Sequence, residues 1–456
     1  MTETAESRSA RPLAVVILAA GAGTRMRSDR PKVLHQIAGL SMLGHVIGAA
    51  RALAPARLVV VTGHGAEAVG AEARASAGDV ALTVCHQAEQ RGTGHAVLAA
   101  APGLDGFEGD VLVLYGDTPL LRSETLARLV AAEGALRVLG FETNAPAGYG
   151  RLVIGAEGLE RIVEANDATP EEQAITACNS GVMAADAGVL LGLLAKVEPA
   201  NAQGEYYLTD TVALARAQGM AVSAVMGSEA EMQGVNDRVQ LAAAETIWQA
   251  GAREAAMRAG ATMRDPASVF LAHDTTIGRD VEIGPNTVFG PGVVLEDGAR
   301  VEAFCHLEQC RIGSGASVGP FARLRGGAVV GSDCRIGNFV EAKNTIFAPG
   351  AKAAHLSYVG DAEIGAGANL GAGTITCNYD GFTKHRTEIG AGAFIGTNTA
   401  LIAPITVGPG AYVATGSVLT EDVPGDALAL ARTRQVTKPG RAARLRALLS
   451  ARKKGA

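Results

Sequence analysis

A glycine turn near the start of the chain has the composition of a phosphate-binding loop. The apolar run Leu13–Leu18 leads into Gly21-Ala22-Gly23-Thr24-Arg25. It is not a P-loop, because no Lys-Ser/Thr follows the glycines, and Met26 stands where G-x-G-x-x-G needs its last glycine. Small residues still let backbone N–H groups approach phosphate oxygens, and Arg25 and Lys32 can neutralise phosphate charge. On its own, the motif is equally compatible with an ordinary turn flanked by charges.

Asp117 is a candidate ligand for a hard cation. It follows the apolar run Val111–Leu114, and loops after the strands of α/β sheets commonly bind ligands. Carboxylate oxygens suit Mg²⁺. Because Asp is also a common turn residue and helix cap, its place after a strand does not decide between the two roles.

A six-residue rhythm fills the second half of the chain. The apolar positions, with one Thr, are Ile277, Ile283, Phe289, Leu295, Val301, Leu307, Ile312, Val318, Leu324, Val330, Ile336, Ala342, Ile364, Leu370, Thr376, Ile389, Ile395, Leu401, Val407, Val413 and Leu419. The next residue is often Gly, as in Ile283-Gly284. Such a period predicts a β-solenoid of hexapeptide repeats, in which each of these positions points inward.

The rhythm is broken in two places. It lapses around 345–363, which contains His355, and it is interrupted at 377–387. Interruptions of a solenoid are often external loops, and loops on rigid scaffolds commonly carry function.

The first half alternates apolar runs with helical segments. Leu13–Leu18, Leu58–Val61, Val80–Val84 and Val111–Leu114 are predicted strands, so we expect an α/β domain with a largely parallel sheet. We expect this domain at 1–236, a helical linker at 237–261 with Asn236 or Asp237 as its cap, and the repeat domain with a basic C-terminal tail at 262–456.

Composition bounds the class of protein. At 456 residues the chain is long enough for two or three domains, and 48% of it is hydrophobic. A net charge of -6 argues against general nucleic-acid binding. The six scattered cysteines suit structural thiols in a reducing compartment. The first dozen residues lack a signal-peptide core, and no apolar run reaches membrane-helix length, so we expect a cytoplasmic protein without membrane insertion.

Several motifs together make a resemblance specific. L-x-x-G-x-G-T-R-M with Pro31-Lys32 resembles the signature of sugar-1-phosphate nucleotidyltransferases. Further matching segments are Gln87, Gly92-Thr93-Gly94-His95, Tyr115-Gly116-Asp117, Gly148-Tyr149-Gly150-Arg151, Asn179-Ser180-Gly181 and Val235-Asn236. With the repeats, nearly the full chain resembles the bacterial family of bifunctional N-acetylglucosamine-1-phosphate uridyltransferases and glucosamine-1-phosphate acetyltransferases.

The resemblance implies a first site that transfers uridylate from UTP. Its nucleotide and sugar residues would be Leu18, Ala19, Ala20, Gly21, Lys32, Gln87, Gly92, Thr93, Tyr115, Gly116, Asp117, Gly150, Glu164, Asn179 and Asn236. Asp117 and Asn236 would bind Mg²⁺, and Arg25 and Lys32 would be catalytic. A sugar-phosphate oxygen attacks the α-phosphorus of UTP, so the site must align and neutralise two anions, and no protein nucleophile is needed.

The resemblance also implies a second site, which transfers acetyl from acetyl-CoA to the amine of glucosamine-1-phosphate. His355 would be the base, because an amine attacks only when neutral. Arg325, Lys343, Tyr358 and Asn369 would bind the sugar phosphate, and acetyl-CoA would contact Ala372, Asn378, Tyr379, Thr397, Thr415 and Arg432. Thr397, Thr415 and Asn166 depart from the residues usual in the family, where Ser, Ala and Lys are frequent, which puts fine positioning in doubt.

We therefore expect synthesis of UDP-N-acetylglucosamine, acetylation first, for peptidoglycan and lipopolysaccharide precursors. The expected fold is a Rossmann-like nucleotidyltransferase domain, a helical linker and a left-handed parallel β-helix, assembled as a homotrimer. The alternative is a single-activity nucleotidyltransferase with a structural or regulatory β-helix, the layout of ADP-glucose and GDP-mannose pyrophosphorylases. A non-catalytic scaffold is a further rival, but it would not need Asp117, Asn236, Arg25 and Lys32.

Overall fold

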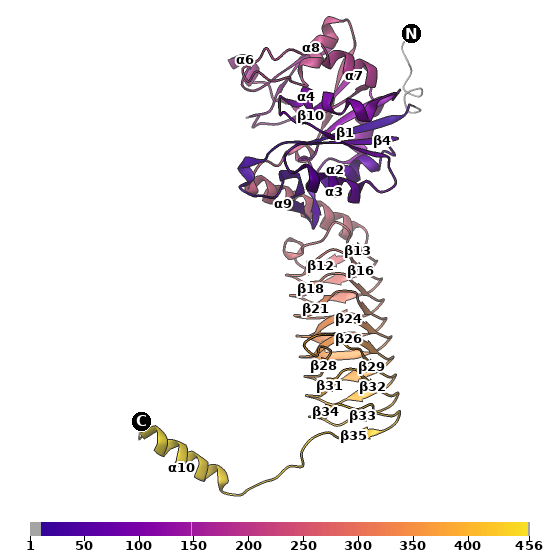
Figure 1. Ribbon diagram of the computed structural model, residues 1–456, viewed down its shortest axis with the longest axis vertical. Coiled ribbons are helices and arrows are strands. Elements are labelled where there is room, and N and C mark those ends of the chain that lie inside the picture. Colours follow the sequence, from indigo (N-terminus) through magenta and orange to yellow (C-terminus); the bar gives the residue numbers. More distant parts are fainter. Residues whose placement is uncertain (1–10, 147, 455–456) are drawn as a thin grey trace. The chain divides into compact units, whose positions relative to one another are not determined.

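The computed structural model of the chain describes residues 11–146 and 148–454. They form two compact units, one that ends at Ala252 and one that begins at Arg253: an α/β unit and a stack of β-coils (Figure 1). The division lies inside helix α9 (Arg238–Arg258), within the predicted linker segment. Asp237 caps this helix, because its carboxylate accepts hydrogen bonds from the backbone N–H groups of Val239 and Gln240 at 2.9 and 2.8 Å.

The first unit is built on a nine-stranded sheet, whose main path runs β11-β7-β10-β6-β1-β4-β5. Its strands are β1 (Leu13–Ala19), β4 (Arg57–Thr62), β5 (Leu82–His86), β6 (Asp110–Tyr115), β7 (Leu136–Glu142), β8 (Arg151–Gly155), β9 (Gly158–Val163), β10 (Ala177–Asp186) and β11 (Val222–Gly227). The four predicted strands correspond to β1, β4, β5 and β6, which pair in parallel as expected. Strand β10 runs antiparallel to β6 and β7, so the sheet is mixed.

Helices cover both faces of this sheet (Figure 1). They are α2 (Met42–Arg51), α3 (Ala66–Ala77), α4 (Thr93–Ala99), α5 (Ser123–Ala131), α6 (Pro170–Gln173), α7 (Ala187–Leu194) and α8 (Asp210–Ala217). Side chains of β1 alternate between two cores, since Val16 packs with residues of α4, α7 and α8, while Val15 packs with residues of α2, α3 and α5. The run of apolar residues is therefore a strand that is buried on both sides.

The carboxyl ends of the parallel strands meet at one edge of the sheet. Because β1 is parallel to β4 and β6, and β4 to β5, the segments that follow β1, β5 and β6 share this edge. These segments carry the glycine turn, Gln87 and Asp117. The topology thus gathers three predicted binding segments at the place where α/β sheets bind ligands.

The second unit is a left-handed parallel β-helix. One sheet contains β12 (Thr262–Met263), β14 (Glu282–Ile283), β17 (Arg300–Val301), β20 (Ser317–Val318), β23 (Arg335–Asn338), β25 (Lys352–His355), β27 (Asn369–Leu370), β30 (Phe394–Ile395), β33 (Tyr412–Val413) and β35 (Leu428–Ala429). The other contains β13 (Thr276–Ile277), β15 (Val288–Phe289), β16 (Val293–Leu295), β18 (His306–Leu307), β19 (Cys310–Ile312), β21 (Arg323–Arg325), β22 (Ala328–Val330), β24 (Glu341–Phe347), β26 (Tyr358–Ile364), β28 (Ile375–Cys377), β29 (Thr387–Ile389), β31 (Ala400–Ile402), β32 (Ile405–Val407) and β34 (Val418–Leu419).

Burial confirms the six-residue rhythm. Every position predicted to point inward is buried, except Ile277 in the first coil, which is half-buried. The predicted lapse of this rhythm around 345–363 is wrong, however. Phe347, Ala353 and Val359 are buried there and continue the row of inward-pointing side chains. The spacing shortens to five residues between Ala342 and Phe347, which hid the pattern.

The interruption at 377–387 is a real external loop between β28 and β29. Its Tyr379 and Phe382 are 61% and 93% exposed. The basic tail contains helix α10 (Arg441–Lys454), in which every described residue is exposed. Within the described part of the chain, no helix is both long and apolar enough to cross a membrane.

Candidate active sites

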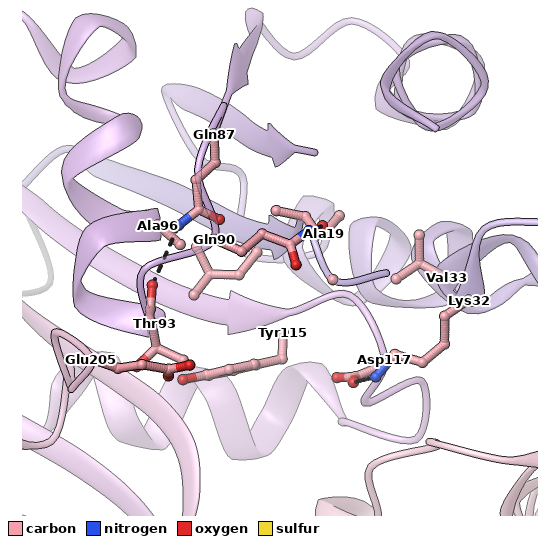
Figure 2. A pocket seen from close by; sticks show the side chains of 14 residues that line it. Ala19, Lys32, Val33, Gln87, Gln90, Thr93, Ala96, Tyr115, Asp117 and Glu205 are labelled. Atoms are coloured by element: carbon pink, nitrogen blue, oxygen red, sulfur yellow. Dashed lines mark hydrogen bonds and ion pairs between the residues drawn. The ribbon is translucent and has the colours of Figure 1, made fainter. Parts of the chain in front are cut away.

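A pocket of about 240 Å³ opens at the carboxyl edge of the first unit's sheet (Figure 2). Most of the predicted nucleotide residues line it: Leu18, Ala19, Ala20, Gly21, Lys32, Gln87, Gly92, Thr93, Tyr115 and Asp117. They come from the end of β1 and the turn after it, from η2 (Lys32–Leu34), from the segment after β5, from the start of α4, and from the end of β6 with the residues that follow it. The pocket is thus assembled from segments that are far apart in the sequence.

Of the two predicted catalytic cations, Lys32 lines this pocket and Arg25 does not. Lys32 begins the 3-10 helix η2 (Lys32–Leu34), and its stem packs against the glycine turn. Gly23 has φ +63°, and a Cβ there would stand 2.5 Å from the Cβ of Lys32, so only glycine fits. Arg25 lies on η1 (Thr24–Met26) and is exposed.

Asp117 and Asn236 face a common point. The Lys32 ammonium contacts Oδ2 of Asp117 and donates to Oδ1 of Asn236 at 3.1 Å. The side chains of Lys32 and Asp117 are only 13% and 20% exposed. Segments from positions 32, 117 and 236 are therefore brought together around one positive charge.

These two oxygens fit a hard divalent cation. A carboxylate and a carboxamide oxygen are donors that Mg²⁺ accepts, with water and phosphate oxygens in the remaining positions. Among the residues that the structure describes, no group of three or more His, Cys, Asp or Glu side chains could hold a metal ion. These donors therefore suit an ion whose coordination shell is completed by a phosphorylated substrate, rather than one that only protein side chains hold.

The other side of the pocket carries polar groups that suit a nucleoside. The Gln87 amide nitrogen lies 3.0 Å from Nδ1 of His95 and 3.4 Å from the Gly92 carbonyl oxygen. Tyr115 hydrogen-bonds to Thr93, and burial raises the pKa of Tyr115, so its hydroxyl stays neutral. A neutral amide and a neutral phenol therefore line this side of the pocket.

Sequence reasoning missed four residues that line this pocket: Val33, Gln90, Ala96 and Glu205. The Gln90 amide donates to the Ala20 carbonyl oxygen at 2.6 Å, so it lies over the turn after β1 (Figure 2). Gln90 stands between Gln87 and Gly92, and this position was the available signal. Glu205 is far along the chain, and nothing in the sequence places it at this pocket. It lies there because the Tyr206 N–H donates to the Arg91 carbonyl oxygen at 2.9 Å.

The predicted sugar-binding residues Gly150, Glu164 and Asn179 lie close together, although they do not line this pocket. The Asn179 N–H donates to the Gly150 carbonyl at 2.8 Å, and a Cβ on Gly150 would stand 3.4 Å from Oε2 of Glu164. Burial raises the pKa of Glu164, while a 3.0 Å hydrogen bond from Thr209 opposes the shift. Gly116 is buried and its N–H binds the Leu18 carbonyl at 2.9 Å, which ties β6 to β1.

In the second unit, His355 is oriented by Asn338. These residues end β25 and β23 and are partners in register. Nδ1 of His355 lies 2.6 Å from Oδ1 of Asn338, and since a carbonyl oxygen only accepts, Nδ1 carries the hydrogen. Nε2 is then the basic nitrogen. Both residues border a pocket of about 320 Å³ with Phe321, Phe339 and Arg335.

Three cations gather on the adjacent face. Arg325 on β21 pairs in register with Lys343 on β24, and Lys384 of the external loop lies beside Lys343. The contact with Lys384 lowers the pKa of Lys343, and Arg325 adds to this repulsion. The Arg325 Nε donates to Glu341 at 2.8 Å. A phosphate dianion would relieve the repulsion among these cations.

Tyr358 and Asn378 lie near this group. Gly360 is the register partner of Lys343, and a Cβ on Gly360 would stand 2.5 Å from the Tyr358 hydroxyl and 2.8 Å from the Asn378 amide nitrogen. Asn369 lies on β27, in the sheet that carries His355 rather than beside Arg325. The predicted sugar-phosphate residues thus occupy two neighbouring faces of the solenoid.

The predicted acetyl-CoA residues follow His355 down successive coils. Backbone hydrogen bonds link Gly373 to His355 at 3.4 Å, Asn398 to Ala372 at 2.7 Å and Gly416 to Thr397 at 2.8 Å. Ala372, Thr397 and Thr415 therefore form one line below His355. The Arg432 guanidinium contacts the Thr415 carbonyl and closes this line. Exposed Tyr379 stands in the external loop.

Known families match both halves of the chain. The MobA-like NTP transferase domain matches residues 15–175, bacterial transferase hexapeptide repeats match 274–309 and 309–344, and the hexapeptide repeat of succinyl-transferase matches 386–421. The chain is 56% identical to "Bifunctional protein GlmU" of Paracoccus denitrificans (strain Pd 1222) over 443 residues, which cover 97% of this chain and 99% of that protein. It is 57% identical to the protein of the same name from Ruegeria sp. (strain TM1040) over 444 residues, 96% and 98% of the two chains.

Proposed function

Because the chain belongs to the GlmU family of bifunctional proteins, we propose that its two sites catalyse the two steps in the order acetylation, then uridylylation. It is an enzyme with acetyltransferase and uridylyltransferase activities in the synthesis of UDP-N-acetylglucosamine. The observation that best supports two separate active sites is that one chain contains both the Lys32–Asp117–Asn236 cluster and the Asn338–His355 pair.

In the first site, a phosphate oxygen of N-acetylglucosamine-1-phosphate attacks the α-phosphorus of UTP, and pyrophosphate leaves. Lys32 and the backbone N–H groups of the glycine turn would neutralise phosphate charge. Gln87 and Thr93 would hold the nucleoside, and Glu164 with Asn179 the sugar. The site aligns the two substrates and stabilises their charge. The reaction therefore needs no nucleophilic side chain.

The family uses a divalent metal ion, and we assign Mg²⁺ as that ion, with Asp117 and Asn236 as its ligands. When bound, the ion supplies Lewis-acid stabilisation of the phosphate oxygens. What supports the assignment is the convergence of two hard oxygens at a single point that already attracts a cation.

In the second site, the amine of glucosamine-1-phosphate attacks the thioester carbonyl of acetyl-CoA. Nε2 of His355 takes the amine proton and returns it to the departing thiolate. Arg325, Lys343 and Lys384 would bind the sugar phosphate. The line Ala372–Thr397–Thr415 would hold acetyl-CoA, so that its thioester meets the amine beside His355.

The single-activity alternative does not account for the second unit. A structural β-helix has no use for an oriented imidazole on one face and three clustered cations on the adjacent face. The relatives described as bifunctional, at 56% and 57% identity over nearly the whole chain, decide against it as well.

We also propose a homotrimer in the cytoplasm. The hexapeptide-repeat solenoid suggests oligomerisation, and its surface carries stacked, exposed Phe304, Phe321 and Phe339, with centroid distances of 4.9 and 5.1 Å. The six cysteines are free thiols, which suits a reducing compartment. Light scattering on the purified protein should give three times the chain mass of 46.4 kDa, and a monomeric mass at micromolar concentration would reject the trimer.

Two variants test the division of labour. His355→Ala should abolish acetyl transfer, because it removes the proposed base of that reaction. It should leave uridylyl transfer to pre-acetylated sugar phosphate intact, because the residues of that site lie in the first unit. Asp117→Ala should do the reverse. Acetylation at the wild-type rate by His355→Ala, or full uridylyl transfer by Asp117→Ala at limiting Mg²⁺, would overturn the corresponding assignment.

A further inference from the structure

The Lys32 ammonium occupies the point on which the two proposed metal ligands converge. It contacts Oδ2 of Asp117 and lies 3.1 Å from Oδ1 of Asn236. Only 13% of the Lys32 side chain and 20% of the Asp117 side chain are exposed, so the contact lies largely inside the pocket. In this structure, the proposed cation site is therefore filled by a side chain of the protein itself.

Asn236 makes the two cations mutually exclusive. The Asn236 carboxamide oxygen accepts the hydrogen bond from Lys32 with one of its two lone pairs. A Mg²⁺ ion on the same oxygen would meet the ammonium as a like charge at short range. Asp117 has a second oxygen to offer, but Asn236 does not. Binding of the ion through both residues thus requires Lys32 to leave.

The displaced ammonium has a destination within the same pocket. Lys32 lines the pocket together with Gly21 of the glycine turn, where phosphate oxygens would lie. Its attachment is fixed, because the stem packs against Gly23 and Lys32 starts η2, while its four-carbon chain can turn. The side chain can therefore exchange the two oxygens for phosphate without movement of the backbone.

We propose that Lys32 is an internal substitute for the metal ion, and that the ion and Lys32 change places when nucleotide binds. Lys32 holds Asp117 and Asn236 in position and compensates the partly buried carboxylate until the ion arrives. The ion then takes the oxygens, and Lys32 moves to the phosphates. This inference rests on the proposed metal ligands. It predicts that metal and nucleotide favour each other's binding, because nucleotide gives the displaced ammonium a partner.

The test is Mn²⁺ binding to the nucleotide-free full chain, measured from the free Mn²⁺ signal in electron paramagnetic resonance. Lys32→Met should bind Mn²⁺ at least about five-fold more tightly than the wild type, the lower end of typical coupling between sites. The matched control is Arg25→Met, which removes a positive charge from the neighbouring exposed turn without touching either oxygen. It should bind Mn²⁺ as the wild type does.

The outcomes separate this inference from the proposed function. Equal Mn²⁺ affinities of the wild type and Lys32→Met, or an equal gain in Arg25→Met, would overturn the exchange, even if Lys32→Met has lost uridylyl transfer. Asp117→Asn in the Lys32→Met background should remove the tight Mn²⁺ site. If that site persists, the metal ligands are assigned wrongly, and both the exchange and the metal site of the proposed function fail.

Discussion

Asn338 determines which nitrogen of His355, the proposed base, has a free lone pair. Its carboxamide oxygen accepts the Nδ1 hydrogen at 2.6 Å, which leaves the Nε2 lone pair for the substrate amine. His355 is exposed, so it has few other contacts to set its orientation. Asn338 is accordingly a positioning residue rather than a catalytic one.

Replacing this amide by a carboxylate should change the pH dependence of acetyl transfer. In Asn338→Asp the negative charge favours the protonated imidazole, so the acid limb of the kcat/KM profile should move to higher pH, while the rate at high pH stays within about ten-fold of the wild type. Asn338→Ala is the control, since it removes the orientation without adding charge. An acid limb that stays in place in Asn338→Asp would contradict the contact with His355.

Glu164, which we propose as a sugar-binding residue, lowers the stability of the fold at neutral pH. Burial raises its pKa in the folded state above the unfolded value, so its contribution to stability falls as pH rises through the folded pKa. Glu164→Gln should therefore unfold at a higher Tm than the wild type at pH 8, with the difference shrinking at pH 4. The same variant should show a KM for the sugar phosphate about ten-fold higher, through loss of a charged hydrogen bond. A lower Tm at pH 8 would contradict the burial argument.

At the scale of elements, the coils position His355 by close backbone contact. Gly337 on β23 faces β25 so closely that a Cβ would stand 1.8 Å from the Ala354 carbonyl oxygen, next to His355. Gly337→Ala should push these strands apart and lower acetyl transfer by about 100-fold, the cost of a misplacement near 1 Å. Uridylyl transfer should remain within two-fold, roughly the scatter expected of a distant change.

Gly251→Ala is the matched control for this substitution, because it adds the same methyl group within α9 where nothing lies within 4 Å. It should leave both activities unchanged. Normal acetyl transfer by Gly337→Ala would show that the spacing of β23 and β25 does not set the position of His355.

The elements were largely predictable because their signals are local. Inward positions of the solenoid repeat every six residues, and the apolar runs of β1 and β6 end at the glycine turn and at Asp117. The contacts that define the sites are not local. Asn338 meets His355 only because the coils stack in register, and Glu205 reaches the pocket through a pairing with the segment before α4. The prediction that the rhythm lapses around 345–363 is wrong, because the coils accommodate a five-residue spacing between inward-pointing side chains.

At the scale of the whole molecule, one chain contains two chemistries that need different conditions. Uridylyl transfer joins two anions and needs the divalent metal ion, whereas acetyl transfer needs a neutral amine and a base. Described residues of each site come from one compact unit only, with Lys32, Asp117 and Asn236 before Ala252, and His355, Lys343 and Thr415 after Arg253. Chelation of the metal should therefore stop one activity and spare the other.

The most direct measurement follows the products of the full-length wild type by mass. With glucosamine-1-phosphate and acetyl-CoA in EDTA, we predict N-acetylglucosamine-1-phosphate and free CoA. Addition of UTP and excess Mg²⁺ should then give UDP-N-acetylglucosamine and pyrophosphate. Failure to consume acetyl-CoA, or uridylylation of the unacetylated sugar phosphate in preference to the acetylated one, would show that the two sites do not act in succession.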